Sequence, residues 1–481
     1  MRTLIIYPAV RHFSGNGVFF MQRDMTVGSP FKVVLNFTIP IFIGNVFQQF
    51  YNMADAVIVG KFVGTDALAA VGSTGTIMFL IFGLITGMSV GFTVLTSQYY
   101  GAGDMDGMRR SVGSAVVLSA VITVAMTLVT VLGMRWILTI MQTPQNIFDD
   151  AYAYIVIICA GIFTQVLYNL LSSILRALGN SKTPLYFLIL AALLNIVLDL
   201  VLVIVFHMGT AGAAYATVIS QGISGLLCLI YIIKKVPLLK LRRSDFKLDW
   251  FLIKNQLRVG CPMALQFSIT AIGTTMVQVS LNLLGSVYVA AFTAAGKIEQ
   301  VVTQSYVALG TTLATYAAQN IGAQKYQRIR DGFRAATIMS LVYSVVIGIL
   351  VAFAGKQLTY LFIEVDNPVI IEYVDVYLKC VTAFFIPLSI IYLYRNGIQG
   401  MGYGLLPMMG GIAELVGRAI LAIAGFVSRS YLVICLASPA AWVLAAGLLL
   451  WSYYHIMKQY REIPSLSETE QSYPCKTPQT K

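Results

Sequence analysis

The sequence predicts an all-α membrane protein with twelve transmembrane helices, arranged as two parallel six-helix repeats around a central cavity. Three observations lead to this fold class. Hydrophobic residues fill 58% of the 481 positions and charged residues only 11%, whereas about 25% of the residues in soluble domains are charged. Long apolar runs recur along the whole chain, and its two halves resemble each other. This composition excludes a soluble enzyme.

Twelve apolar runs are long enough to cross a bilayer, which takes about 20 residues of helix. They cover residues 31–59, 67–99, 111–140, 151–175, 184–206, 211–233, 259–283, 287–320, 335–361, 369–394, 405–427 and 431–456. Several runs are longer than a perpendicular span requires. We therefore expect tilted helices, or helices that extend beyond the membrane.

The positions of Lys and Arg orient the chain, which has a net charge of +12. Four lie on one side of the predicted membrane (Lys61, Arg135, Lys356, Arg429), three lie inside predicted spans (Lys297, Lys379, Arg418), and all others lie on the opposite side. Because loops rich in Lys and Arg stay in the cytoplasm, both termini are predicted to be cytoplasmic, in a multi-pass protein of the cell membrane. The charge is thus explained by orientation and indicates no nucleic-acid partner.

The chain divides into five predicted segments. They are an N-terminal cytoplasmic extension (1–30), a first lobe (31–235), a basic cytoplasmic linker (236–257), a second lobe (258–458) and a cytoplasmic tail (459–481). The linker is predicted to lie on the membrane surface as an orientation signal. Met1, Met21 and Met25 remain alternative start positions.

The two lobes match at a nearly constant spacing. The matched pairs are Pro40 with Pro262, Gln98 with Gln319, Gly101 with Gly322, Arg109 with Arg330, Gly179 with Gly402 and Pro184 with Pro407. Each lobe has six spans, so the second lobe begins on the same side of the membrane as the first. The repeats are therefore parallel and related by an axis along the membrane normal, as in many alternating-access transporters.

Asn195 and Asp199 lie inside the apolar run 184–206. A carboxylate in hydrocarbon costs at least about 2.5 kcal/mol, so it faces a partner, water or a ligand. The spacing i, i+4 places both side chains on one helix face. This pattern favours an ion or proton site; the alternative is a polar pair that holds two helices together.

A second carboxylate, Asp55, lies near the end of the first run, within FQQFYNMADAVIVG. Asn52 shares its helix face, and Gln49 lies nearby. The alternative is that Asp55 caps the outer end of the helix. Pro40, upstream, removes one helical hydrogen bond and permits a bend.

Two polar residues from other spans, Asn169 and Thr217, offer further oxygen ligands. Together with Asp55 and Asp199 they are predicted to form an oxygen-rich shell for a proton or a small cation. Asp55, Asn195 and Asp199 are the candidate ligands of a sodium ion. Taken singly, Asn169 and Thr217 are more typical of helix packing.

The second lobe carries a different polar set. Lys297 and Glu299 are two positions apart and do not face each other on a helix; Glu299 is the better functional candidate because it lies nearer the middle of its span. Glu414 and Arg418 are spaced for an internal ion pair, with contact to substrate as the alternative.

Lys379 is predicted to neutralise Asp375, four positions earlier, or to extend toward the membrane surface. We assign no role to Lys379 or to Lys297. The six cysteines show no CxxC spacing, and no catalytic triad or phosphate-binding loop appears. We therefore expect neither a cofactor nor an enzymatic activity.

Several of these stretches resemble the multidrug and toxic compound extrusion (MATE) family. They are QQFYNMADAVIVG, the Asn195/Asp199 pair, AAGKIEQ, and the paired GxG and QNIGA loops, and the resemblance covers about residues 28–458. It implies a V-shaped protein of two six-helix lobes that exports cationic or amphiphilic drugs against an inward flux of protons or sodium ions.

The resemblance also implies roles for individual residues. Asp55 matches a carboxylate in helix one, and Asn195 with Asp199 matches a pair in helix five. Asn169 and Thr217 match polar partners of that site, and Glu299 matches an acid often required for transport. Members with a sodium site in the second lobe carry an aspartate in helix ten. Here only Glu372 and Asp375, at the helix entrance, are candidates, so the first lobe is favoured.

The sequence therefore predicts a monomeric antiporter that works by alternating access. Its predicted substrate cavity includes Gln49, Asn52, Glu299, Glu414 and Arg418. One alternative is a lipid-linked oligosaccharide flippase of the same superfamily, which would line its cavity with Lys and Arg. The other is a membrane enzyme acting on lipid phosphates, which would need clustered acids beyond the single doublet Asp149-Asp150. The coupling ion, the natural substrate and the stoichiometry stay open.

Overall fold

The computed structural model describes residues 24–360 and 368–461, and over these residues the protein is helical and has no β-strand. The first half contains α1 (Pro30–Phe62), α2 (Thr65–Ser73), α3 (Gly75–Ala102), α4 (Met105–Ile140), α5 (Gln145–Ala160), α6 (Ile162–Ala177), α7 (Lys182–Asp199) with the π-helical turn η1 (Leu200–Val205), and α8 (Gly209–Lys235). Two short 3₁₀ turns, η2 (Pro237–Leu239) and η3 (Arg243–Phe246), follow in the linker.

The second half repeats this order of helices. It contains α9 (Trp250–Asn282), α10 (Ser286–Gly322), α11 (Tyr326–Thr359), α12 (Pro368–Thr382), α13 (Phe385–Gly400), α14 (Leu405–Ser428), α15 (Tyr431–Cys435) and α16 (Ala437–Arg461). We call α1–α8 the N-lobe and α9–α16 the C-lobe.

The helices account for the twelve predicted spans. Among the described residues, nine helices are long and apolar enough to cross a membrane, and two bent helix pairs bring the number to eleven. The remaining span is α10, whose 37 residues include Lys297, Glu299, Gln300 and Gln304. These polar residues explain why it is less apolar than the others. The predicted fold class is confirmed.

Two predicted spans are bent in a way that the apolar runs do not indicate. The fourth consists of α5 and α6, which meet at 46°, and the tenth consists of α12 and α13, which meet at 52°. The first span, in contrast, is one α-helix that continues through Pro40. Hydropathy reports only the length of an apolar segment, so such breaks depend on packing between helices.

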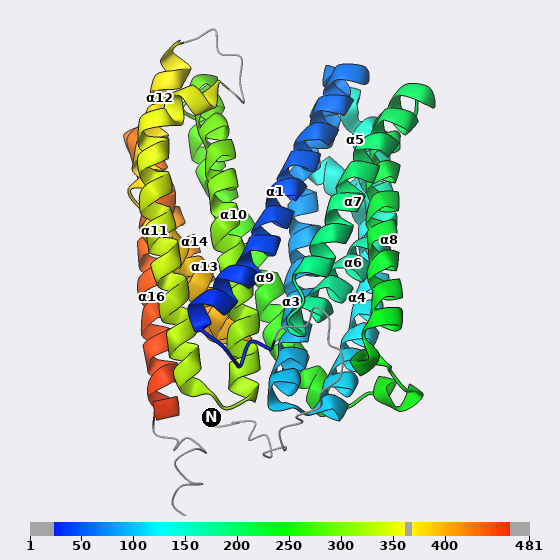
Figure 1. Ribbon diagram of the computed structural model, residues 1–481. Helices are drawn as coiled ribbons and strands as arrows, with labels where there is room; N and C mark the ends of the chain where they lie inside the picture. The colour runs from blue at the N-terminus through cyan, green and yellow to red at the C-terminus, as the bar shows by residue number, and fades with distance from the viewer. Residues whose placement is uncertain (1–23, 361–367, 462–481) are drawn as a thin grey trace, which may run out of the picture.

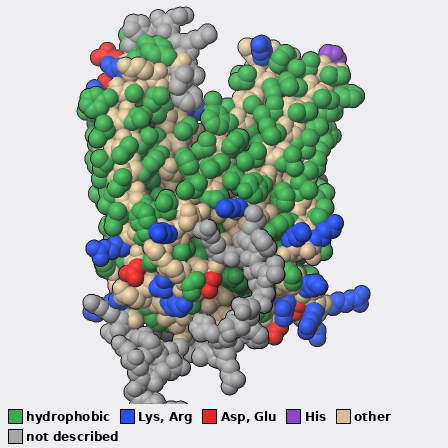
Figure 2. Space-filling model, in the orientation of Figure 1, with side chains coloured by type: hydrophobic (Ala, Val, Ile, Leu, Met, Phe, Trp, Pro, Cys, Tyr) green, Lys and Arg blue, Asp and Glu red, His purple; other side chains and the backbone are tan. Residues whose placement is uncertain are grey.

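The two lobes meet at one end of the molecule and diverge at the other. Figure 1 shows α1 beginning and α16 ending at the end where the lobes meet. Figure 2 shows an opening between the lobes at the opposite end, and Lys and Arg side chains gathered toward the closed end. Hydrophobic side chains cover most of the visible height of the molecule, as expected for a surface in contact with lipid.

A reciprocal contact between α3 and α10 closes the lobes at this end. A Cβ atom on Gly101 would lie 2.0 Å from the Gln319 carbonyl oxygen, and one on Gly322 would lie 1.9 Å from the Gln98 carbonyl oxygen. Only glycine permits such close backbone approach. Gly101 corresponds to Gly322, and Gln98 to Gln319, in the sequence repeat. The axis that relates the two repeats therefore passes through this contact.

The segment that precedes α1 is fastened to the C-lobe. The Met25 N–H donates to Gln319 Oε1 at 3.0 Å, and the Met25 carbonyl accepts from Arg328 Nη2 at 3.2 Å. Lys325 Nζ donates to the Thr26 carbonyl at 2.9 Å. The last residues of the predicted N-terminal extension thus belong to the fold. Residues 1–23 and 462–481, including the alternative starts Met1 and Met21, lie outside the described part of the chain.

Candidate functional site

Buried polar side chains from two neighbouring helices meet inside the N-lobe. Asn195 and Asp199, on α7, are 1% and 0% exposed. Thr217, on α8, is also buried, and its Oγ1 lies 3.5 Å from Asn195 Nδ2. The spacing i, i+4 on α7 directs both polar residues toward α8 rather than toward lipid. The helix changes to the π-helical turn η1 directly after Asp199, and such turns are frequent at functional sites.

Asp55, on α1, supplies the second carboxylate of this cluster. It lies within electrostatic range of Asp199. In the described structure Asp55 Oδ1, Asn195 Oδ1 and both carboxylate oxygens of Asp199 are buried without a hydrogen-bond partner. A buried carboxylate without a partner is costly, and two neighbouring negative charges add repulsion. A bound proton or a small cation would relieve both costs.

The oxygen atoms of this cluster suit a hard cation. Carboxylate, amide and hydroxyl oxygens are the ligands that hard metal ions prefer, and they suit a proton equally well. Within residues 24–360 and 368–461, no group of three or more His, Cys, Asp or Glu side chains could hold a metal ion.

Further polar residues are buried or half-buried on the same helices; Gln48 follows from the sequence pattern around Asp55, whereas Tyr51, Gln221 and Ser224 were not predicted. Tyr51, on α1, is buried and lies within electrostatic range of both carboxylates. Gln221 Oε1 and Ser224 Oγ, on α8, are further buried atoms without a hydrogen-bond partner in the described structure. Gln221 and Ser224 follow Thr217 by four and seven positions, so their shared helix face is a signal that the sequence contains.

Not all of the predicted N-lobe residues join this cluster through hydrogen bonds. Asn169 Nδ2 donates to the Gln165 carbonyl, one turn back in α6, at 2.8 Å. Within the described residues no hydrogen bond connects Asn169 to Asp55 or Asp199. Gln49 is half-buried and Asn52 is exposed. This hydrogen bond lies within one helix, which agrees with the alternative that Asn169 contributes to helix packing.

In the C-lobe, Glu299 is already hydrogen-bonded. It accepts a hydrogen bond of 2.6 Å from the Tyr377 hydroxyl, on α12. The Tyr377 ring packs edge-on against Phe292, with centroids 4.6 Å apart. Lys297, two residues before Glu299, is exposed, in agreement with the prediction that these two side chains do not face each other. The sequence did not indicate Tyr377 as the partner.

Glu414 lies between two arginines. Its carboxylate is 3.5 Å from Arg418 Nη2, as the i, i+4 spacing predicts, and 3.4 Å from Arg395 Nη1. Arg395 follows the tenth predicted span directly; the structure includes it in α13, and its side chain is only 14% exposed. The predicted pair of Lys379 with Asp375 is confirmed, at 2.7 Å.

The comparisons with known proteins agree with this architecture. A family model described as MatE matches residues 40–201 and 262–424, one segment in each lobe. The chain belongs to the MatE family. MatE proteins are membrane transporters, and the resemblance noted from the sequence is confirmed.

Curated relatives cover most of the MatE chain. A Bacillus subtilis (strain 168) protein named "Probable multidrug resistance protein YpnP" is 32% identical over 78% of this chain and 83% of its own length. A second protein of that strain, "Probable multidrug resistance protein YoeA", is 30% identical over 68% of this chain and 72% of its own length.

A solved structure supports the MatE fold independently. It is described as the outward-facing conformation of a multidrug resistance MATE family transporter, and it superposes with a TM-score of 0.86 at 23% identity. The match covers 92% of this chain and 98% of that one. This likeness establishes the fold alone.

Proposed function

We propose that this chain is a secondary active multidrug efflux antiporter, which exports cationic or amphiphilic organic compounds in exchange for protons or sodium ions. The observation that carries the coupling half of this proposal is the set of buried oxygens without partners on Asp55, Asn195 and Asp199. The relatives named as multidrug resistance proteins support the cargo half. Family membership favours this function over a lipid-linked oligosaccharide flippase or a membrane enzyme.

Coupling follows from the charge of the Asp55 and Asp199 cluster. When the ion binds, it neutralises a carboxylate that is otherwise buried without a partner, so it favours the packing in which the cluster is enclosed. When the ion leaves toward the cytoplasm, the carboxylate is charged again. The arrangement of the lobes in which the cluster is not enclosed is then favoured. Each net charge that moves inward down 100 mV releases about 2.3 kcal/mol.

The described conformation corresponds, in this proposal, to the outward-open state. Lys and Arg gather at the end where the lobes meet, and such residues mark the cytoplasmic side. The opening between the lobes then faces the outside. We also propose that both termini are cytoplasmic and that the protein is a monomer. The predicted boundaries of the two lobes, the linker and the tail are part of the same proposal.

The test is dye export by the purified protein in liposomes, with the proton gradient and the sodium gradient imposed separately. We expect ethidium efflux to follow one of the two gradients. Asp55→Asn and Asp199→Asn should each abolish the coupled efflux, because a neutral amide neither carries a proton nor attracts a cation strongly.

The matched control is Asp66→Asn, which changes an exposed carboxylate in the first turn of α2. This variant should transport like the unmodified protein. Unchanged ethidium export by both Asp55→Asn and Asp199→Asn would defeat the assignment of the coupling site. Ethidium export that depends on neither the proton gradient nor the sodium gradient would contradict the antiporter proposal itself.

A further inference from the structure

The linker between the lobes carries an exposed surface that is both apolar and basic. Four large exposed apolar side chains lie within six positions of the chain, and they are Phe246, Leu248, Trp250 and Phe251. Leu248 and Trp250 are 66% and 73% exposed. Exposed cations lie between and beside them in the chain, at Lys240, Arg242, Arg243, Lys247 and Lys254. We call these nine residues the linker face.

The linker face lies beyond the apolar spans on either side of it. Span α8 ends with Lys234 and Lys235, and exposed Lys254 and Arg258 follow in the first turns of α9. Such cations mark the boundary between hydrocarbon and headgroups. Figure 1 shows the turns between α8 and α9 projecting sideways from the end where the lobes meet, and Figure 2 shows Lys and Arg side chains gathered at this corner. The linker face therefore lies at the level of the lipid headgroups.

The linker is fixed to the N-lobe rather than a loose tether. The backbone of η3 lies directly against α4, since a Cβ atom on Gly113 would be 2.1 Å from the Asp245 carbonyl oxygen. At the start of α9, Gln256 Nε2 donates to the Ser111 carbonyl at 2.8 Å, and Gln256 Oε1 accepts from Ser114 Oγ at 2.9 Å. The exposed side chains of the linker face thus project from a backbone that is held on both sides.

The cations of the linker face have no counter-charge in the described part of the chain. None of its ion pairs includes a Lys or Arg of the linker. The two acids of the linker bind backbone groups: Asp245 Oδ2 accepts from the Arg242 N–H at 2.7 Å, and Asp249 Oδ1 accepts from the Phe251 N–H at 2.9 Å. Residues 236–258 hold six Lys and Arg against these two Asp. The linker face therefore attracts anions.

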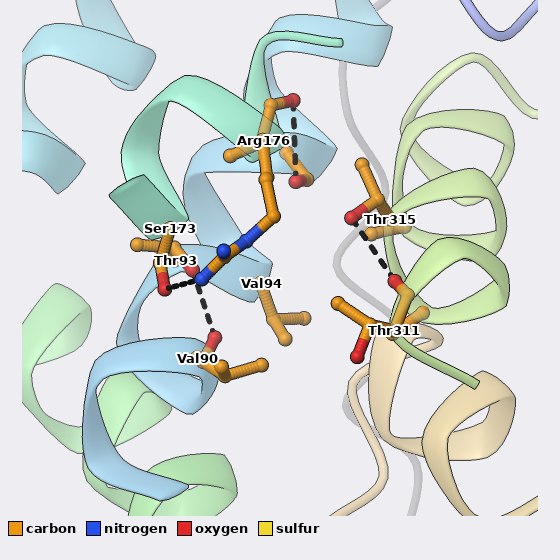
Figure 3. Close-up of a pocket in the computed structure, with 11 residues that line it drawn as sticks. Val90, Thr93, Val94, Ser173, Arg176, Thr311 and Thr315 are labelled. Carbon is orange, nitrogen blue, oxygen red and sulfur yellow. Dashed lines mark hydrogen bonds between the residues drawn. The ribbon is translucent and has the colours of Figure 1, made fainter. Parts of the chain in front are cut away.

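Other cations near the closed end are already engaged. Arg176, on α6, extends into a small pocket between the lobes, with α10 on the opposite wall (Figure 3), and its Nη2 donates to Ser173 Oγ at 2.9 Å. Arg328 donates to the carbonyls of Met25 and Gly28 at 3.2 and 2.9 Å. These arginines join parts of the protein to each other, whereas the cations of the linker face point away from it.

We propose that the linker face binds a bilayer surface that contains anionic phospholipid. Its apolar side chains enter the boundary between headgroups and acyl chains, and its cations contact the phosphates. Apolar side chains alone would fit any bilayer, and cations alone would fit a soluble anion; an anionic membrane satisfies both. Trp favours this depth in particular. The linker face is separate from the Asp55 and Asp199 cluster, so the proposal does not depend on which ion drives transport.

Trp250 provides the test, because bromine on a neighbouring lipid quenches the fluorescence of Trp. A protein with Trp136→Phe, Trp442→Phe and Trp451→Phe keeps Trp250 alone. It is reconstituted in phosphatidylcholine bilayers with equal small shares of brominated phosphatidylglycerol or brominated phosphatidylcholine. The apparent affinity for the phosphatidylglycerol should be about fivefold or more greater, because each Lys or Arg near an anionic surface contributes about that factor.

The decisive variant combines Arg242→Gln, Arg243→Gln and Lys247→Gln. It should bring the two lipids within about twofold of each other, since the cations next to Trp250 are lost. Arg242→Lys with Arg243→Lys keeps the charge and should keep the preference. The matched control removes three exposed cations outside the linker, by Lys61→Gln, Arg135→Gln and Arg429→Gln, and should also keep it.

Three results would overturn the proposal. They are equal quenching by both lipids, quenching by neither, which would leave the linker face to water or a soluble partner, and a preference that survives the loss of the three linker cations. Should the protein with a single Trp fold poorly, the difference in quenching between unmodified protein and Trp250→Phe measures the same preference. Ethidium efflux is assayed separately, so its failure contradicts the proposed function and leaves the lipid site standing.

Discussion

Asp199 and Glu414 are both buried carboxylates in apolar helices, yet their surroundings differ. Glu414 is held by Arg395 and Arg418 at 3.4 and 3.5 Å. Both oxygens of Asp199 are without a hydrogen-bond partner in the described structure. A carboxylate that already has cationic partners gains little from an added cation, whereas one without partners gains much. The difference supports the ion-binding role proposed for Asp199 and agrees with the internal ion pair predicted for Glu414.

Thr217 gives a first prediction at the scale of single residues. Thr217→Val keeps the shape of the side chain but removes the hydroxyl 3.5 Å from Asn195 Nδ2. A buried hydrogen bond is worth about 1 kcal/mol, so the concentration of coupling ion that half-saturates efflux should rise about fivefold. The measurement is the rate of dye efflux against sodium concentration or pH. Thr217→Ser should stay within twofold; equal behaviour of both variants would remove Thr217 from the site.

Glu414 gives a second prediction. Glu414→Gln leaves Arg395 and Arg418 buried without a counter-charge, which should cost about 3 kcal/mol and lower the midpoint of thermal unfolding in detergent by several degrees. Lys379→Gln is the control, because the Lys379 side chain is 62% exposed and an exposed pair contributes at most about 1 kcal/mol. Glu414→Gln as stable as the unmodified protein would show that the arginines have other partners.

At the scale of helices, the glycines of α3 and α10 set how closely the lobes approach. Gly101 and Gly322 belong to the same position of the two repeats, and each faces the backbone of the other helix. A contact between backbones has no flexible side chain that can move aside. The spacing of α3 and α10 at this end therefore depends on the absence of two Cβ atoms.

Gly101→Ala tests this contact. Its Cβ atom would lie 2.0 Å from the Gln319 carbonyl oxygen, so α3 and α10 should move apart and the lobes should open at this end. Spin labels on Asp106→Cys and Gln327→Cys, one on each lobe, should report a longer distance by pulsed electron resonance. Gly447→Ala, where a Cβ atom meets no atom within 4 Å, should leave the distance unchanged. An unchanged distance in Gly101→Ala would contradict the role of this contact.

At the scale of the whole molecule, the distribution of Lys and Arg predicts the orientation in the membrane. Asp66, in the first turn of α2, and Gln327, in the first turn of α11, are both exposed. The helix α1, which α2 follows, ends where the lobes diverge, and α11 begins at the end where they meet (Figure 1). If Lys and Arg mark the cytoplasm, these two ends face opposite sides of the membrane.

This orientation can be measured with a maleimide that does not cross membranes. In a background without native cysteines, Asp66→Cys should react in intact cells. Gln327→Cys should react only in inside-out vesicles. The reverse pattern would invert the predicted orientation, and with it the direction in which the described conformation opens.

The number of spans, the parallel repeat and the residues most costly to bury could all be predicted from the sequence. These properties are local or depend on regular spacing: an apolar run of sufficient length must cross the membrane, and a carboxylate such as Asp199 inside it demands an explanation. The contact of Gly101 with Gln319 also joins residues from the matched loops that reveal the repeat.

Which polar residues meet could not be predicted from the sequence and became clear only from the packing of the helices. Arg176 and Arg395 lie within one or two residues of the predicted ends of their spans, so hydropathy assigns them to the cytoplasm. The bends between α5 and α6 and between α12 and α13, and the packing around them, place Arg176 beside α10 and Arg395 beside Glu414. The partnership of Glu299 with Tyr377 likewise joins residues 78 positions apart. Lateral packing among twelve apolar helices depends on the shapes of their facing surfaces, which hydropathy and spacing along one chain do not specify.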